Sequence, residues 1–125
     1  MYAVGESHPH KKPSMALLER IADGDLKAAT DTEVLQEILY RFCAIQLADK
    51  ALEVFDHFLL VVPVVFPVTK RDMVRAKSFL VENSGLQPRD AVHAAVMLNN
   101  GLKNLYSYDR HFDRIPGIHR IEPSV

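Results

Sequence analysis

Hydrophobic residues recur every three or four positions in five segments of the chain, a spacing that places them on one face of a helix. Two of these segments also have proline near the start and glycine after the end, which are common helix boundaries. The last segment is apolar nearly all round, as in a helix buried between a sheet and other helices. The five predicted helices cover residues 13–24, 30–45, 48–60, 70–83 and 88–101.

The second predicted helix has the clearest start signal. Thr30 and Glu33 have the spacing of a capping box, so the helix is expected to begin at Thr30. Cys43 lies on this amphipathic helix and is expected to be a small core residue. The predicted apolar stripe consists of Val34, Leu35, Ile38, Leu39, Phe42 and Ile45.

Short stretches rich in strand-forming residues lie between the helices. They cover residues 26–30, 61–69, 102–108 and 119–123. The second contains Pro63 and Pro67, which cannot donate hydrogen bonds to a ladder, so a short or peripheral strand is expected there. Strands that alternate with helices predict an α/β fold with a mostly parallel sheet.

Composition narrows the class of protein. A chain of 125 residues, 48% of them hydrophobic, fits a single domain over residues 1–125. The longest apolar run, residues 58–66, is far shorter than the roughly 20 residues of a membrane helix. The N-terminus lacks the apolar core of a secretory signal, and the single Cys43 fits a reducing compartment, so a cytoplasmic location is expected. The net charge of −1 excludes bulk attraction of a polyanion, so any nucleic-acid partner needs a local source of positive charge.

Three carboxylates are placed where a ligand site is expected. Asp109 directly follows the predicted strand 102–108, at the edge of a parallel sheet where ligands bind. Asp90 lies in the first turn of the helix 88–101, which is expected to open toward the same edge. Glu37 falls just outside the apolar stripe of its helix, between core and solvent.

Each carboxylate also has a purely structural interpretation. The helix dipole favours an acid such as Asp90 in a first turn by about 0.3–1 kcal/mol. Glu37 precedes Arg41 by four residues, a spacing that forms ion pairs on exposed helix faces. Asp109 is a common type of turn-capping residue. The three acids therefore indicate a site only when taken together.

The order of these motifs gives a more specific indication. The segments "TDTEVLQEILYRF" and "LQPRDAVHAAVMLNNGLKNLYSYDRHFDRIPGIHRIEP" resemble the PIN-domain ribonucleases, and most closely the VapC-type toxins of toxin–antitoxin pairs. The resemblance implies a three-layer fold with a mostly parallel central sheet flanked by helices. It also implies that Glu37, Asp90 and Asp109 form an acidic catalytic site, with Ser107 at a small hydroxyl position of the same motif.

The resemblance further implies a cofactor and partners. Mg²⁺ or Mn²⁺ is expected to bind Asp90 and Asp109, with Glu37 bound directly or through water, and to supply the positive charge that an RNA substrate needs. An antitoxin protein and a second copy in a homodimer are the expected protein partners. Family members begin with an apolar strand that ends in an acid, followed by a stretch like "MYAVG"; this sequence begins at "MYAVG", so the first strand and its acid are expected to be missing.

Several further residues are candidates for support. Asp113 is a reserve acid whose structural interpretation is a turn partner of Arg110 or Arg114. His93 is expected to orient Asp90 or to bond to the backbone, and Asp31 is a weaker reserve acid. Scattered basic residues are candidates for RNA contact: Lys11, Lys12, Lys70, Arg71, Arg110 and Arg114.

Two functions remain open from the sequence. The first is a metal-dependent endoribonuclease of the VapC type. The alternative is a catalytically impaired PIN-like module that binds RNA or an antitoxin without cleavage. There is no phosphate-binding glycine loop and no nucleophile motif to support a covalent hydrolase.

Overall fold

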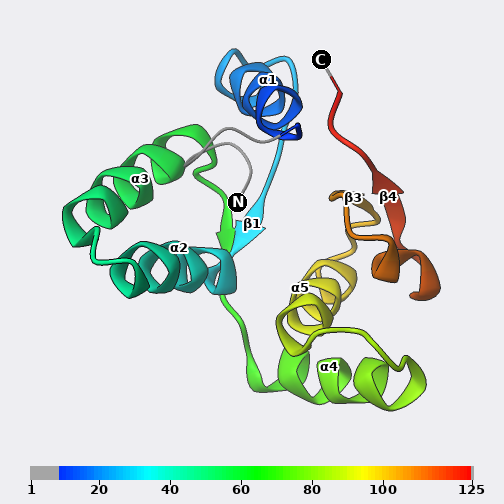
Figure 1. Cartoon of the computed structure of the whole chain (residues 1–125). Helices are drawn as coiled ribbons and strands as arrows, with labels where there is room; N and C mark the ends of the chain where they lie inside the picture. The colour runs from blue at the N-terminus through cyan, green and yellow to red at the C-terminus, as the bar shows by residue number, and fades with distance from the viewer. Residues whose placement is uncertain (1–8, 125) are drawn as a thin grey trace.

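The computed structural model describes residues 9–124 as five α-helices, four short strands and one 3-10 helix (Figure 1). Residues 1–8 and 125, and with them the expectation about the start of the chain, lie outside the described part. The elements, in chain order, are α1 (Lys11–Ala22), β1 (Thr30–Asp31), α2 (Thr32–Ala44), α3 (Ala48–Val61), β2 (Val65–Phe66), α4 (Lys70–Glu82), α5 (Pro88–Asn99), β3 (Asn104–Tyr106), η1 (Arg110–Arg114) and β4 (His119–Ile121).

All five predicted helices are present, but the start signal of α2 was misassigned. The residue that caps α2 is Asp31, whose carboxylate accepts a hydrogen bond from the backbone N–H of Val34, and not Thr30. Thr30 is a strand residue instead, because it pairs with Val65 of β2. The capping box of this chain is at α4, where Thr69 and Asp72 satisfy each other's backbone N–H groups.

Cys43 is exposed, so its predicted place in the core is wrong. The buried side of α2 consists of Ile38 and Phe42, which pack with Ala51 of α3. Cys43 lies about 100° around the helix from Phe42 and therefore faces away from α3. Two members of the predicted stripe, Leu39 and Ile45, are exposed as well.

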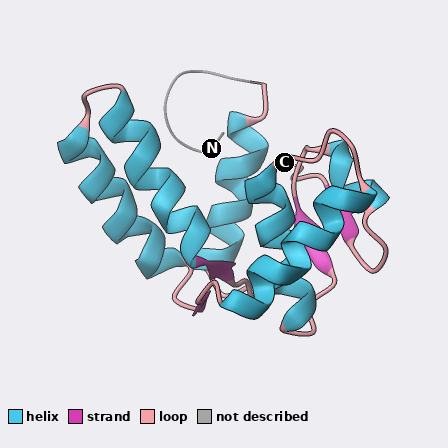
Figure 2. Ribbon diagram, turned by 90° about the horizontal axis from the view of Figure 1, so that it is seen from below, coloured by secondary structure: helices cyan, strands magenta, loops and turns pink. Residues whose placement is uncertain are grey.

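The four predicted strands are present but have only two or three residues each. β1 pairs with β2 and β3 pairs with β4, both in parallel, which confirms the predicted α/β class with parallel strands. Among residues 9–124 these pairs form two separate two-stranded sheets instead of one central sheet. Figure 2 shows the two pairs of strands apart from each other, with helices around them.

Two hydrophobic cores accompany the two sheets. The smaller core belongs to α2 and α3, with Ile38, Phe42 and Ala51 buried. The larger core lies where α4 and α5 pack on each other, and its buried residues include Phe79 of α4, five residues of α5 and Phe112 of η1. We call residues 11–66 the N-terminal half and residues 70–121 the C-terminal half. Within the described chain, no helix is long and apolar enough to cross a membrane.

Candidate functional site

Asp90 and Asp109 lie side by side in the C-terminal half, as the sequence predicted. Pro88 begins α5, which places Asp90 in its first turn, and Asp109 follows β3 as the capping residue of η1. Burial raises the pKa of Asp90 to about 6, and so do a hydrogen bond with the side chain of Asp109 and the negative charge of that residue. Two carboxylates this close repel each other once both are ionised, and a divalent cation bound between them would offset that repulsion.

Asp109 is fixed by its neighbours in the loop after β3. Its Oδ1 accepts hydrogen bonds from the backbone N–H of His111 at 2.9 Å and lies 2.7 Å from the imidazole Nδ1. Burial opposes ionisation of Asp109, but these hydrogen bonds, together with that of Asp90, hold its pKa below the ordinary value. The hydroxyl of Ser107 accepts a hydrogen bond from the backbone N–H of Asp109 at 3.1 Å. The turn-capping interpretation of Asp109 is therefore confirmed, and the same turn aims its carboxylate at Asp90.

Glu37 approaches from the N-terminal half and is held by two arginines. Its Oε1 lies 2.8 Å from Nε of Arg41, one turn along α2, and 3.7 Å from Nη1 of Arg89, the residue before Asp90. The predicted pair of Glu37 and Arg41 is therefore confirmed. Among residues 9–124, no three His, Cys, Asp or Glu side chains are grouped closely enough to hold a metal ion. The structure thus brings Asp90 and Asp109 together, whereas Glu37 pairs with Arg41 and Arg89.

His93 and Asp31 form a buried contact that the sequence analysis missed. His93 was expected to contact Asp90 or the backbone, but its Nδ1 lies 2.7 Å from Oδ2 of Asp31, which is 5% exposed. Burial opposes protonation of His93, but the hydrogen bond to Asp31 and the charges of Asp31, Asp90 and Glu37 together raise its pKa above the ordinary value. Aspartate is a common capping residue, but the spacing of Thr30 and Glu33 placed the predicted start of the helix ahead of Asp31.

Asp113 lies outside this group of acids. Its carboxylate is exposed and accepts hydrogen bonds from Arg120, at 2.9 Å from Nε and 3.3 Å from Nη2. The prediction that Arg110 or Arg114 pairs with Asp113 is therefore wrong, because Arg120 of strand β4 forms the hydrogen bonds with this carboxylate. Arg120 also donates to the carbonyl oxygen of Ser107, which supports the turn that carries Asp109.

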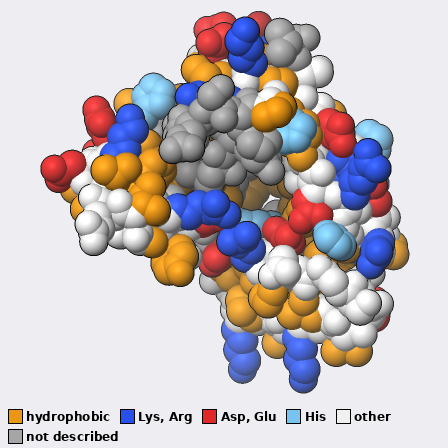
Figure 3. All heavy atoms as spheres, viewed as in Figure 1, with side chains coloured by type: hydrophobic (Ala, Val, Ile, Leu, Met, Phe, Trp, Pro, Cys, Tyr) orange, Lys and Arg blue, Asp and Glu red, His pale blue; other side chains and the backbone are white. Residues whose placement is uncertain are grey.

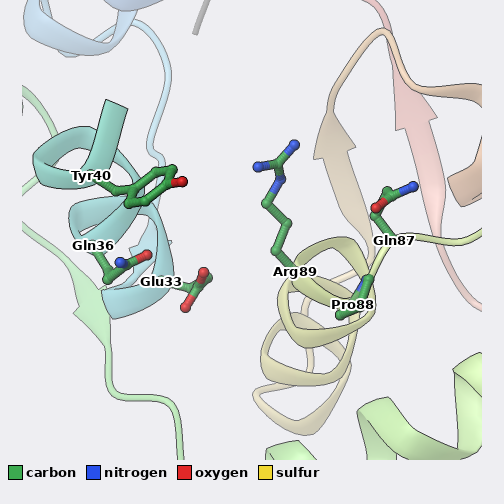
Figure 4. A pocket seen from close by; sticks show the side chains of 6 residues that line it. All are labelled: Glu33, Gln36, Tyr40, Gln87, Pro88 and Arg89. Carbon is green, nitrogen blue, oxygen red and sulfur yellow. The ribbon is translucent and has the colours of Figure 1, made fainter. Parts of the chain in front are cut away.

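An open groove of about 330 Å³ lies beside these residues, between α2 and the start of α5 (Figure 4). Tyr40 from α2 and Arg89 from α5 extend into it from opposite walls. On the face shown in Figure 3, acidic and basic side chains gather together at the centre of the molecule. The groove is lined by Glu33, Gln36, Tyr40, Gln87, Pro88 and Arg89.

Comparison with known proteins assigns the chain to a family. Residues 1–118 match the model of the PIN domain. The chain belongs to the PIN-domain family. Ribonuclease VapC13 of Mycobacterium tuberculosis and VapC ribonuclease Mb1869c of Mycobacterium bovis are each 42% identical to this PIN domain, over 97% of its length and 92% of theirs. Ribonuclease VapC23 of Mycobacterium tuberculosis is 27% identical over 87% of the chain and 86% of the relative. No solved structure gives a significant match.

The acids of this PIN domain fit a hard divalent cation. Asp90 and Asp109 supply carboxylate oxygens from two elements, and Mg²⁺ is commonly held by one or two carboxylates together with water and substrate phosphate. The raised pKa of Asp90 reflects in part the negative charge of Asp109, which a bound cation would neutralise. Glu37 fits less directly, because Arg41 and Arg89 already neutralise it.

Proposed function

We propose that this PIN domain is a metal-dependent endoribonuclease, acting as the toxin of a VapC-type toxin–antitoxin pair. The observation that carries the proposal is the meeting of Asp90 and Asp109 at one point, with Glu37 and two arginines facing them from α2 and α5. The relatives, which are named ribonucleases and match nearly the whole chain, support the same activity.

The proposed cofactor is Mg²⁺ or Mn²⁺. Asp90 and Asp109 would hold the ion, and Glu37 would reach it directly or through water. When bound, such an ion lowers the pKa of a coordinated water and stabilises the leaving oxygen of a phosphodiester. Arg89 lies 3.7 Å from Glu37 and precedes Asp90 in α5, so it would place positive charge beside the scissile phosphate.

The groove between α2 and α5 is the proposed path of the RNA. Tyr40 is 66% exposed and offers an aromatic face for a base, and Gln36 and Gln87 offer amide groups to its edge. Lys12, Lys70, Arg71 and Arg110 are exposed, and their contact with RNA stays a prediction. Arg114 donates a hydrogen bond to the carbonyl oxygen of Ser84, which makes it a structural residue as well.

The proposed protein partners are an antitoxin and a second copy of the chain, in the cytoplasm. The exposed surfaces of α1 and α2 are the proposed place for an amphipathic antitoxin segment, because they carry the exposed apolar side chains Met15, Leu39 and Tyr40. An antitoxin bound there would contact Tyr40 and therefore obstruct the groove. The homodimer is proposed from family resemblance alone.

The decisive experiment is RNA cleavage by purified protein with Mn²⁺ or Mg²⁺. We expect Asp90→Asn and Asp109→Asn each to reduce cleavage to the level of the wild type in excess chelator, because each removes a charged oxygen ligand. Asp56→Asn, at an exposed position of α3, is the matched control and should cleave as the wild type does. Circular dichroism of all three variants checks that the fold is kept.

Two results would contradict the proposal. Retained cleavage by both Asp90→Asn and Asp109→Asn would reject these residues as the site. If wild-type protein binds RNA or an antitoxin but never cleaves RNA with either metal, the alternative function applies, namely an impaired PIN-like binding module.

A further inference from the structure

In the part of the chain that the structure describes, the helices pack mainly within each half of the molecule. α2 and α3 pack mainly on each other, and so do α4 and α5, with a separate core for each pair. Glu37 belongs to the first half, and Asp90 and Asp109 belong to the second. The distance between Glu37 and the other two acids therefore depends on how the halves are held together.

Asp31 contacts both halves through different oxygens. Its Oδ1 accepts the backbone N–H of Val34 at 3.0 Å and so caps α2, the helix that carries Glu37. Its Oδ2 lies 2.7 Å from Nδ1 of His93 on α5. The side chains of Asp31 and His93 are 7% and 17% exposed, so water competes little for this contact.

His93 lies one turn after Asp90 on the same face of α5. A hydrogen bond that fixes His93 therefore also fixes the first turn of α5, where Asp90 is held. One carboxylate thus holds the beginning of α2 and the first turns of α5 in one arrangement.

We infer that Asp31 and His93 are a positioning pair, which sets the separation between Glu37 and the Asp90–Asp109 pair. The inference rests on the proposed function insofar as these acids are a metal site. The two residues act through the helices that they hold and are not themselves ligands of the ion.

Asp72 provides a matched control for a purely structural role. It is the other buried carboxylate in the described chain, at 3% exposure. Its Oδ2 accepts the backbone N–H of Thr69 at the start of α4, and its Oδ1 accepts the side-chain amide of Asn99 on α5 at 2.7 Å. Asp72 therefore combines a cap with a link to α5, as Asp31 does, but both of its helices belong to the C-terminal half.

The first test measures Mn²⁺ binding by calorimetry, with the substitutions Asp31→Ser, His93→Phe and Asp72→Ser. Serine is a good helix cap, so Asp31→Ser preserves the cap of α2 and removes only the link to His93. We expect Asp31→Ser and His93→Phe each to weaken Mn²⁺ binding by about 10- to 100-fold, the usual range for residues that orient ligands. The double variant should be no weaker than either single variant, because both remove the same contact. Asp72→Ser should bind Mn²⁺ within about 2-fold of the wild type, even if its melting temperature falls as much as that of Asp31→Ser.

The second test requires no metal. Spin labels on Cys43, the exposed cysteine of α2, and on an introduced cysteine at the exposed position Lys77→Cys of α4 report the distance between the halves. The distance distribution should broaden with Asp31→Ser and with His93→Phe, and stay as in the wild type with Asp72→Ser.

Each outcome decides a different question. If Asp31→Ser and His93→Phe have the same Mn²⁺ affinity and the same label-distance distribution as Asp72→Ser, the positioning pair is rejected. If Asp31→Ser weakens Mn²⁺ binding and His93→Phe does not, Asp31 is itself a ligand and the inference is again wrong. If the wild type binds no Mn²⁺ but the label distances broaden as expected, the pair is upheld and the metal proposal fails.

Discussion

Asp90 is a residue whose ionisation affects the stability of the folded chain. Its pKa is raised from 3.8 to about 6 by burial and by Asp109, so the folded chain holds this proton more tightly than the unfolded chain does. The resulting stabilisation is complete below about pH 4 and is lost as the pH rises through about 6. Because the carboxyl is only half buried, solvent screening limits the effect to about 1 kcal/mol.

The raised pKa of Asp90 predicts a measurable dependence of the melting temperature on pH. In the presence of a chelator, the melting temperature of the wild type should fall by about 4 °C more than that of Asp90→Asn as the pH rises from 4 to 7. The asparagine has no proton to lose, so its curve lacks this contribution. Asp56→Asn should follow the wild type, and parallel curves for wild type and Asp90→Asn would show that Asp90 ionises normally.

The sequence could identify some site residues and not others. Asp90 and Asp109 were predictable because each lies at the end of an element whose boundary is marked locally, by Pro88 and by the strand before Asp109. Asp31 and His93 are 62 positions apart, and neither has a local signal for the other. Their pairing depends on how α2 and α5 meet, which no periodicity in one segment reports.

At the scale of elements, helices were easier to predict than strands. α3 and α4 match their predicted ranges within one residue, because an apolar stripe repeats over three or more turns. β1 and β2 have two residues each, too few for any alternation of apolar and polar positions. Their existence was predictable from composition, but their length and their division into two sheets were not.

The groove between α2 and α5 leads to a prediction about substrate binding. Tyr40→Ala should raise KM for RNA by about 5- to 100-fold, since stacking contributes about 1–3 kcal/mol per base, and should leave kcat nearly unchanged. Tyr40→Phe keeps the ring and should behave as the wild type. Cleavage kinetics of a short RNA with each variant provide the measurement.

The opposite pattern would exclude this path for the RNA. An equal loss with Tyr40→Phe would mean that the hydroxyl matters and not the aromatic face. A loss confined to kcat would place Tyr40 near the reacting atoms instead of in a binding groove.

For the molecule as a whole, the two cores differ in size. The core of α4 and α5 has ten buried residues, whereas that of α2 and α3 has three. The free energy needed to open an element locally increases with the apolar surface that the element buries. The family's first strand is expected to be missing from this sequence, and this expectation stays a prediction because residues 1–8 lie outside the described part.

Hydrogen exchange can detect this difference. We expect backbone amides of α5 to exchange more slowly than those of α3 by about 10-fold or more, the effect of about 1.4 kcal/mol in opening free energy. α4, which shares the larger core, serves as the internal reference and should be close to α5. Equal protection of α3 and α5 would show that the chain opens as one unit.

The division of the described chain into two cores has a consequence for heat inactivation. If Asp31 and His93 separate while both cores stay packed, a sample retains nearly all its helical signal after Glu37 has moved away from Asp90 and Asp109. We therefore expect the proposed activity to be lost at a lower temperature than the one at which the helices unfold.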